Sequence, residues 1–330
     1  MPPAQPVAVI GAGSWGTALA VLLAGDGRPV RLWSHEAPHV AELLQFGENK
    51  SFLPGISLPT NIQPTGDLAE ALRDNALPLL VIPSHAFRSV LEAIKPLLGN
   101  GTPVAWATKG LDPASGNLLS DSAAAILGSE HPLAIVSGPS FAAEVAKGLP
   151  TAVTVAASDP AFAQRLAELL RAEAFRTYYS EDLIGVQIGG AVKNVLAIAA
   201  GAVAGAGLGA SAEAAMVTRG FVELRRVGAA YGARPETLMG LSGLGDLILS
   251  CGSAQSRNFA YGQALGRGEE LEGRPLAEGV ATAAIAAEIA ASRGIEAPIV
   301  AAVDAVLKGK ISITDAVAAL LSRPLKSETD

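Results

Sequence analysis

The sequence predicts an α/β amino-terminal domain built on a doubly wound, mostly parallel sheet, followed by an all-α carboxyl-terminal domain. In the first half of the chain, short β-rich runs alternate with helical stretches, which is the pattern of a parallel sheet covered by helices. After Ser180 these runs stop, and Ala- and Leu-rich segments with helical periodicity follow, for example at 281–291 and 314–321. We therefore place the two domains at residues 1–180 and 181–330.

Each expected strand is a short run of apolar or β-branched residues, and several runs are continuously apolar, as in strands buried on both faces. The expected strands are 7–10, 30–33, 79–82, 104–107, 133–136, 152–155 and 175–179. Helical segments such as 162–170 separate them. In the second half, Pro235, Pro275 and Pro298 divide the chain into helices. The last residues, Lys326 to Asp330, are polar, and we expect a frayed end there.

The composition limits the classes of function. A chain of 330 residues, half of them hydrophobic and 17% charged, has ample core for two domains and is not disordered. The net charge of −7, without a block of like charges, argues against nucleic acid or an anionic membrane as the main partner. With one cysteine, Cys251, and four histidines that lack zinc spacing, we expect neither a disulfide framework nor a metal site.

No basic segment precedes the first apolar run, so we expect no signal peptide. A long uncharged run, 195–212, approaches the length of a membrane span. It consists mostly of Ala and Gly and has no cluster of basic residues at its ends, which favours a buried helix over a membrane span. A soluble cytoplasmic protein is the expectation.

A glycine-rich motif, Gly11-Ala12-Gly13-Ser14-Trp15-Gly16, directly follows the first strand and opens a helix. In such a motif Gly11 permits the tight turn, Gly13 lets a pyrophosphate approach the backbone, and Gly16 lets helix and strand pack closely. The helix N-terminus then binds the phosphates. Because a strand precedes the motif and a helix follows it, the motif predicts a Rossmann-type dinucleotide site rather than a turn without a ligand.

The second expected strand ends at Ser34, His35 and Glu36. Sites for NAD usually place an acid at this strand end, where it binds the ribose 2′-hydroxyl. Here Ser34 and His35 come before the acid, and His35 is able to bind a 2′-phosphate or to lie solvated in a loop. The sequence therefore leaves NADP and NAD both open as the cofactor.

Three further strand ends carry polar residues at the edge where ligands bind in open α/β sheets. They are Pro83-Ser84-His85, Thr108-Lys109-Gly110 and Ser137-Gly138-Pro139-Ser140-Phe141. Lys109 lies where a negative ligand would sit, although a surface lysine is the alternative. We expect Gly138 and Ser140 to begin another helix N-terminus that can hold an anion or an amide.

Two isolated charges lie in apolar segments of the second half. Lys193 is the only charged residue from Leu183 to Ala212, and Asp246 is the only one between Glu236 and Arg257. A buried ammonium without a partner is costly or loses its proton, so it is kept to pair with an acid or to move a proton. We expect the two charges to meet, either as a structural ion pair or as a chemical site.

The segment Gln255-Ser256-Arg257-Asn258 precedes a helical stretch. An arginine, a hydroxyl and an amide at a helix start can cradle a phosphate, or can be a helix cap beside an exposed arginine. With the sites above, this segment predicts reduction of a ketone on a small phosphorylated molecule. Lys193 would protonate the developing oxyanion, Asp246 would orient Lys193, and Arg257 would hold the phosphate.

In its motifs the chain resembles bacterial NAD(P)-dependent glycerol-3-phosphate dehydrogenase over nearly its whole length. The resemblance is carried by GAGSWGTA at 11–18, VIPSH at 81–85, ATKG at 107–110, SGPSFA at 137–142, AVKNV at 191–195, GLGD at 243–246 and QSRN at 255–258. It implies reversible reduction of dihydroxyacetone phosphate to sn-glycerol 3-phosphate, the backbone precursor of phospholipids. It also implies an all-helical second domain and a homodimer.

By the same resemblance, Lys193 is the proton acceptor and donor, and the catalytic residues we predict are Lys193 and Asp246. The cofactor positions are the motif glycines Gly11, Gly13 and Gly16, together with Ser14, Trp15, His35, Lys109, Ala142, Arg257, Leu276 and Glu278. The substrate positions are Lys109, Gly138, Ser140, Lys193, Asp246, Ser256, Arg257 and Asn258.

The chain departs from the family pattern in two segments. After the catalytic lysine the family usually reads Asp-Gly-Leu-Gly-Leu-Gly-Asp-Asn, whereas this chain has AGAGLGAS at 204–211, with Ala204, Ala210 and Ser211 in place of the polar residues. Before Gly279 the family usually reads Val-Val-Glu, and this chain has LAE at 276–278. Neither departure removes a residue assigned to the chemistry, but the first leaves local helix packing, the dimer and the substrate loop open.

Two other functions remain possible from the residues alone. A dehydrogenase of the same two-domain build that acts on a hydroxy acid could use Arg257 for a carboxylate, and a panel of phosphorylated and carboxylated substrates separates the two. A dinucleotide sensor without catalysis would bind the cofactor but would need no buried Lys193 and Asp246.

Overall fold

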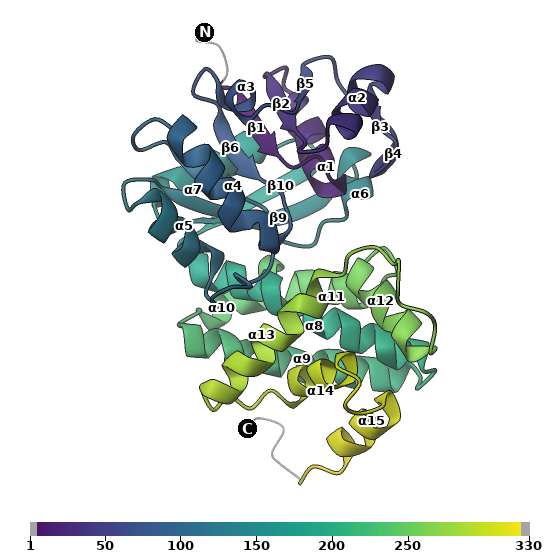
Figure 1. Cartoon of the computed structure of the whole chain (residues 1–330). Helices are drawn as coiled ribbons and strands as arrows, with labels where there is room; N and C mark the ends of the chain where they lie inside the picture. Colours follow the sequence, from purple (N-terminus) through teal and green to yellow (C-terminus); the bar gives the residue numbers. More distant parts are fainter. Residues whose placement is uncertain (1–4, 325–330) are drawn as a thin grey trace.

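The computed structural model of the chain describes residues 5–324. Its first half is a mostly parallel sheet with helices on both faces, and its second half is a group of helices below the sheet (Figure 1). The last strand ends at Ser180 and the first helix of the second half begins at Leu183. The predicted fold class is therefore confirmed. The frayed end expected at Lys326 to Asp330 lies outside the described residues.

The order of the strands is that of a doubly wound sheet. In spatial order the eight strands are β10 (Phe175–Ser180), β9 (Thr151–Ala157), β8 (Leu133–Ser137), β7 (Val104–Trp106), β6 (Leu77–Leu80), β1 (Val7–Ile10), β2 (Val30–Trp33) and β5 (Ile62–Thr65). All neighbouring pairs are parallel except β8 and β9. The carboxyl ends of β1, β2, β6, β7 and β8 consequently meet at one edge, where such sheets bind their ligands.

The sequence located seven strands of this sheet and missed the eighth, β5. Pro64 lies inside β5, and a proline is tolerated in a strand only at positions such as the sheet edge, which β5 occupies. The strand expected at 79–82 is β6, which begins and ends two residues earlier because Leu77 pairs with Val7 and Leu80 pairs with Ile10. The start of this strand was not predicted because Pro78 lies in it, and a proline argues against a strand. A two-stranded sheet of β3 (Glu48–Asn49) and β4 (Leu53–Ser57) was also not predicted.

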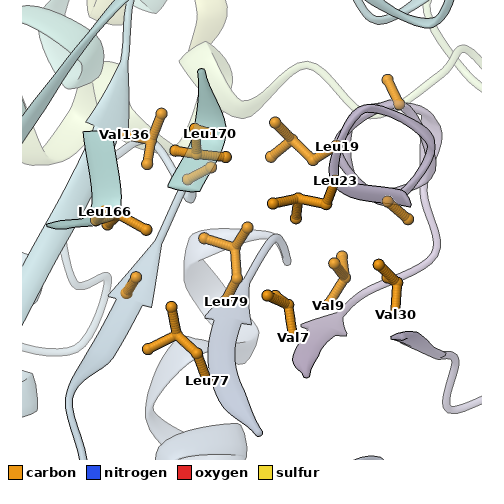
Figure 2. Packing of buried hydrophobic residues seen from close by; sticks show 14 of the residues in the cluster. Val7, Val9, Leu19, Leu23, Val30, Leu77, Leu79, Val136, Leu166 and Leu170 are labelled. Atoms are coloured by element: carbon orange, nitrogen blue, oxygen red, sulfur yellow. The ribbon is translucent and has the colours of Figure 1, made fainter. Parts of the chain in front are cut away.

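Successive residues of β1 point to opposite faces of the sheet, so each face has its own apolar cluster. Val7 and Val9 pack with helices α1 (Ser14–Ala24) and α7 (Pro160–Leu170), whose Leu19, Leu23, Leu166 and Leu170 are seen in Figure 2. The other face packs against α4 (Phe87–Ile94) and α5 (Leu119–Leu127). The shorter or outer helices of this half are α2 (Ala37–Phe46), η1 (Ser84–Ala86), η2 (Lys95–Leu97), α3 (Leu68–Leu72) and α6 (Ala142–Ala146).

The second half is organised around one long buried helix, α8 (Leu183–Gly205). Around it lie α9 (Ala210–Tyr231), α10 (Pro235–Met239), the π-helix η3 (Leu241–Gly245), α11 (Asp246–Cys251), α12 (Arg257–Gly266), α13 (Glu278–Ser292) and α14 (Pro298–Leu307). The last helix, α15 (Ile313–Leu321), packs on α14. Among the described residues, α8 is the one helix long and apolar enough to cross a membrane, and 89% of its apolar window is buried inside the fold. The uncharged run 195–212 is not one helix, because residues 206–209 form the turn between α8 and α9.

Candidate active site

The glycine motif forms a cradle at the start of α1. A Cβ added to Gly11, which has φ +121°, would lie 2.4 Å from the carbonyl oxygen of Val81, and one added to Gly16 would lie 1.8 Å from the carbonyl oxygen of Gly11. A Cβ on Gly13 would meet nothing within 4 Å. No side chain caps α1 at Gly13, which leaves the first N–H groups of the helix available to phosphate oxygens. Two tight glycines beside one that faces open space fit a bound dinucleotide pyrophosphate.

The other residues expected around the cofactor lie near this cradle or on the helical half. Ser14 Oγ donates a hydrogen bond of 2.6 Å to the carbonyl oxygen of Phe52, and Trp15 is half-buried against the sheet core. The His35 side chain at the end of β2 is 75% exposed, with Nε2 3.5 Å from the Glu36 carboxylate. Beside it, the buried Ser34 Oγ lies 3.1 Å from His39 Nδ1.

Lys193 and Asp246 meet as predicted. Lys193 Nζ donates a hydrogen bond of 2.5 Å to Asp246 Oδ1, and a second of 2.8 Å to Ser250 Oγ. Lys193 lies on α8, whereas Asp246 and Ser250 lie one turn apart on α11, so two helices share this polar centre. The side chains of Lys193 and Asp246 are 8% and 2% exposed. A pair this dry is far more strongly coupled than an ion pair at the surface.

A third charge joins the pair from the sheet. Lys109, three residues past the end of β7, donates a hydrogen bond of 2.5 Å to Asp246 Oδ2 and one of 3.4 Å to the carbonyl oxygen of Gly138 at the end of β8. Ser140 Oγ donates to the same Gly138 oxygen at 3.1 Å. The helix expected after Ser140 begins at Ala142 and has only five residues. The ends of β7 and β8 therefore offer an ammonium and a hydroxyl rather than the N-terminus of a long helix.

The electrostatics of this centre follow from burial and from the unequal number of charges. Burial lowers the pKa of Lys193 to about 8, the Asp246 carboxylate opposes this fall, and the neighbouring Lys109 ammonium adds to it. Burial by itself raises the pKa of Asp246, but the two ammonium groups outweigh it and hold that pKa below the usual value. Asp246 is consequently ionised at neutral pH, and Lys193 changes protonation near the pH at which cells work.

Two glycines on α8 let this centre assemble. A Cβ added to Gly189 would lie 2.5 Å from the carbonyl oxygen of Ser242 in η3, and one added to Gly190 would lie 3.0 Å from Ser137 Oγ at the end of β8. Because α8 has no side chain here, it can pack between η3 and the sheet edge. Lys193 is one turn further along the same helix, and this close packing brings its ammonium to Asp246.

The segment 255–258 is a helix start, as expected. Ser256 caps α12, with its Oγ accepting a hydrogen bond of 3.3 Å from the Phe259 N–H. Arg257 is exposed and forms no ion pair with another described residue. Asn258 is buried, where its Nδ2 donates to Asn194 Oδ1 at 3.0 Å and its Oδ1 accepts from the Gly279 N–H at 2.9 Å. The amide of Asn258 thus joins α8, α12 and α13, and the guanidinium of Arg257 is free to bind an anion.

Glu278 and Leu276 lie at the start of α13, beyond Arg257. Burial raises the pKa of the Glu278 carboxyl, and the charges of Arg257, Lys109 and Lys193 oppose this rise. All three cations therefore lie within electrostatic range of Glu278. Leu276 is half exposed, and Ala142 at the start of α6 is half-buried.

Sequence reasoning did not single out Ser250 or Asn194, although both are buried at the centre. Ser250 could have been found from its spacing of four residues from Asp246 on one helix. Asn194 lay inside a quoted motif, but its bond to Asn258 joins residues 64 apart in the chain. Among residues 5–324, no group of three or more His, Cys, Asp and Glu side chains lies close enough together to hold a metal ion. Burial raises the pKa of the nearby Cys251 thiol to about 12, which keeps it neutral.

The departures at 204–211 lie away from this centre. Ala204 is in the last turn of α8, and Ala210 and Ser211 are exposed at the start of α9. Eleven residues of helix separate Ala204 from Lys193, which corresponds to about 16 Å along α8. The departures therefore concern the α8–α9 junction and not the contacts of Lys193.

Comparison with known proteins agrees with this arrangement. Residues 6–163 match the family model for the NAD-dependent glycerol-3-phosphate dehydrogenase N-terminus, and residues 182–318 match the model for its C-terminus. The chain is 58% identical to glycerol-3-phosphate dehydrogenase [NAD(P)+] of Mesorhizobium japonicum, over 98% of this chain and 94% of that protein. The corresponding protein of Chelativorans sp. is 55% identical over 98% of both chains.

A crystal structure of glycerol-3-phosphate dehydrogenase from Coxiella burnetii superposes with a TM-score of 0.93 at 42% identity, covering 97% of this chain and 99% of that one. Both halves of the fold and their arrangement are thus shared with a solved relative. The chain belongs to the NAD-dependent glycerol-3-phosphate dehydrogenase family.

Proposed function

We propose that the chain catalyses the reversible, NAD(P)H-dependent reduction of dihydroxyacetone phosphate to sn-glycerol 3-phosphate, with Lys193 as its general acid and base. The observation that supports this most strongly is the meeting of Lys109 and Lys193 on one buried carboxylate, each 2.5 Å from Asp246. This excess of positive charge faces the sheet edge where dinucleotides bind. A carbonyl oxygen that becomes negative during reduction would be stabilised there.

The bound nicotinamide supplies the hydride, and the side chains of the chain supply charge and the proton. Lys193, with a pKa of about 8, is largely protonated at neutral pH and can give its proton to the substrate oxygen. In the oxidative direction the neutral amine takes the proton back from the hydroxyl. Asp246 orients Lys193, and Lys109 adds a second positive charge beside the reacting oxygen. Residues 1–180 would hold the cofactor and residues 181–330 would supply most of the substrate site.

The direct test follows the oxidation of NADPH, and separately NADH, by purified protein with dihydroxyacetone phosphate. We expect rapid consumption, and the ratio of the two rates measures what Ser34 and His35 select. Because reduction needs protonated Lys193, kcat/KM for reduction should fall as the pH rises through about 8, and kcat/KM for oxidation should rise through the same pH. Cofactor binding without consumption, or the same pH limb in both directions, would contradict the proposal.

Replacing Arg257 with alanine should raise KM for dihydroxyacetone phosphate by roughly 10²-fold, with a smaller loss in kcat. An arginine fork binds a phosphate by charge-assisted hydrogen bonds that are worth about 1.5–3 kcal/mol each. Initial rates at varied substrate concentration measure the change. Arg267→Ala, which removes an arginine paired to Glu269 at the other end of α12, is the matched control and should leave KM unchanged. An unchanged KM in Arg257→Ala would place the phosphate elsewhere.

We also propose that the enzyme works in the cytoplasm as a homodimer. The burial of the apolar helix α8 inside the fold and the single buried thiol of Cys251 support a cytoplasmic enzyme. The dimer rests on the family alone. Sedimentation of the purified protein at several concentrations would measure its mass, and a mass that stays at that of one chain would contradict the dimer.

A further inference from the structure

The segment that carries Lys109 out of the sheet is anchored in the helical half of the molecule. We call residues 110–118, between β7 and α5, the Lys109 arm. Its Leu111 and Leu118 are buried in the apolar cluster of the helical half, together with residues of α8 and α13. Tyr231 of α9 donates a hydrogen bond of 3.4 Å to the carbonyl oxygen of Gly116. The arm therefore leaves one half of the molecule and packs in the other.

The buried carboxylate of Asp112 links the backbone of the arm to side chains of the sheet domain. Asp112 is 1% exposed, and Asp112 Oδ1 accepts a hydrogen bond of 3.0 Å from the Ala114 N–H. Its Oδ2 accepts bonds of 2.5 Å from Ser122 Oγ on α5 and of 3.2 Å from Arg88 Nη1 on α4. Burial by itself raises the pKa of Asp112, but these hydrogen bonds outweigh it and hold the pKa below the usual value. Asp112 is ionised at neutral pH and ties the arm to two helices of the sheet domain.

Backbone hydrogen bonds of Asp112 also hold the turn of the arm. The Asp112 N–H donates to the carbonyl oxygen of Asn117 at 3.0 Å, and the Asp112 carbonyl oxygen accepts from the Gly116 N–H at 2.8 Å. Lys109 is three residues before Asp112, and its ammonium reaches across to Asp246. The position of Lys109 therefore depends on how the arm is held, although Asp112 has no contact with Lys109, Lys193 or Asp246 among the hydrogen bonds of the described residues.

We propose that Asp112 is a positioning residue that holds the Lys109 ammonium on Asp246. The inference rests on the proposed function, because its consequence is read through the acid–base role of Lys193. Lys109 competes with Lys193 for Asp246 and repels its charge. When the arm is no longer held by Asp112, Lys109 moves away from Asp246. Lys193 is then the one ammonium paired with this carboxylate, and its pKa rises.

The sign of the effect separates positioning from direct electrostatics. Removing the negative charge of Asp112 would, by charge alone, make Lys193 lose its proton at lower pH. Movement of the Lys109 ammonium away from Asp246 has the opposite effect, because it raises the pKa of Lys193. An upward movement of the pH midpoint in an Asp112 variant therefore requires that Lys109 has moved.

The test is Asp112→Asn in the full-length enzyme, with kcat/KM for glycerol 3-phosphate oxidation measured across pH. We expect the midpoint of the rising limb to move up by about half a pH unit or more, with a higher KM. Lys109→Met should move it in the same direction and further. In the Lys109→Met background, Asp112→Asn should add nothing, because the residue through which it acts is gone.

Glu223→Gln is the matched control. Glu223 is a buried carboxylate that accepts backbone N–H bonds of 2.7 and 3.0 Å from Ile299 and Val300 at the start of α14, without contact to the arm. It should leave the midpoint in place. If Asp112→Asn does not fold, Arg88→Gln removes one partner of Asp112 and should give a smaller upward shift. Just beyond the arm, Ser120 of α5 and Gln187 of α8 exchange two hydrogen bonds of 3.0 Å, and both variants keep this link between the two halves.

Two results would overturn the inference in different ways. If Lys109→Met moves the midpoint and folded Asp112→Asn does not, Asp112 is only structural, and the proposed function stands. If the midpoint responds neither to Lys109→Met nor to Lys193→Met, Lys193 does not set it, and the proposed function falls together with this inference.

Discussion

Lys193→Ala should lower turnover by a factor of about 10²–10⁴ and leave cofactor binding nearly intact, since this is the range that a positioned general acid contributes. In the proposed mechanism the Lys193 ammonium gives its proton to the substrate oxygen, and its pKa, which burial lowers to about 8, suits that transfer near neutral pH. Lys109 keeps the charge of Asp246 compensated in the variant, so the site does not collapse around a lone carboxylate. Single-turnover reduction measures the chemical step, and titration with NADPH measures binding.

Two further variants make this result interpretable. Lys193→Met keeps most of the buried methylene stem and removes the charge, so it should lose as much turnover as Lys193→Ala while losing less stability. Lys147→Ala, which truncates an exposed lysine at the end of α6, should behave like the unmodified chain. Turnover of Lys193→Ala within about tenfold of the unmodified chain would show that Lys193 is not the general acid.

The fold could be predicted to the extent that it depends on local patterns. Strands such as β1 are continuously apolar because they are buried on both faces, and the glycine motif marks the first turn. The features of the fold that local patterns did not predict depend on which strands pair in the folded sheet. The edge position of β5 makes Pro64 acceptable, and the antiparallel β8–β9 pair has no local signal. The run 195–212 looked like one segment because the turn between α8 and α9, Ala-Gly-Leu-Gly at 206–209, has the same uncharged composition as the helix ends on either side.

In the candidate site, too, local sequence patterns predicted some features and tertiary packing determined the others. Lys193 and Asp246 were expected to meet because each is a lone charge in an apolar segment, and a buried charge needs a partner. The arrival of Lys109 at the same carboxylate could not be predicted, since it joins residues 137 apart and depends on how the sheet docks on the helices. The same holds for the bond between Asn194 and Asn258. In each case the residue type was visible in the sequence, and its partner was set by the packing of α8.

Asp246→Asn should have the second large effect, because it removes the one negative charge between two ammonium groups. An asparagine offers one carbonyl oxygen and one NH2 group, so it can accept from only one of the two lysines and must point a donor at the other. Lys193 is the more buried of the two, with 8% of its side chain exposed against 16% for Lys109. It should therefore lose its proton. We expect reduction near neutral pH to fall by roughly 10²-fold, the lower end of what a general acid contributes.

The loss should be partly reversed at lower pH, and this is what distinguishes it from general damage to the site. As the pH falls below the new pKa of Lys193, the proton returns and the rate of reduction should rise. The kcat/KM profile from pH 5.5 to 9 in steps of about half a unit would resolve this limb. In the same variant, urea unfolding should show a loss of roughly 3–5 kcal/mol, the cost of breaking a buried ion pair from one side.

Asp182→Asn is the comparison that isolates the ion pair from burial as such. Asp182 is also a buried carboxylate in the helical half, but within residues 5–324 its Oδ1 and Oδ2 accept hydrogen bonds, each of 2.8 Å, only from the backbone N–H groups of Gly185 and Arg234. Asparagine can still cap the helix but can accept only one of the two bonds, so the substitution should cost about 1–2 kcal/mol and leave the pH profile in place. If Asp246→Asn lost no more stability than Asp182→Asn and kept the same pH limb, the two lysines would not depend on this carboxylate. The charge on Lys193 would then have to be held by another group.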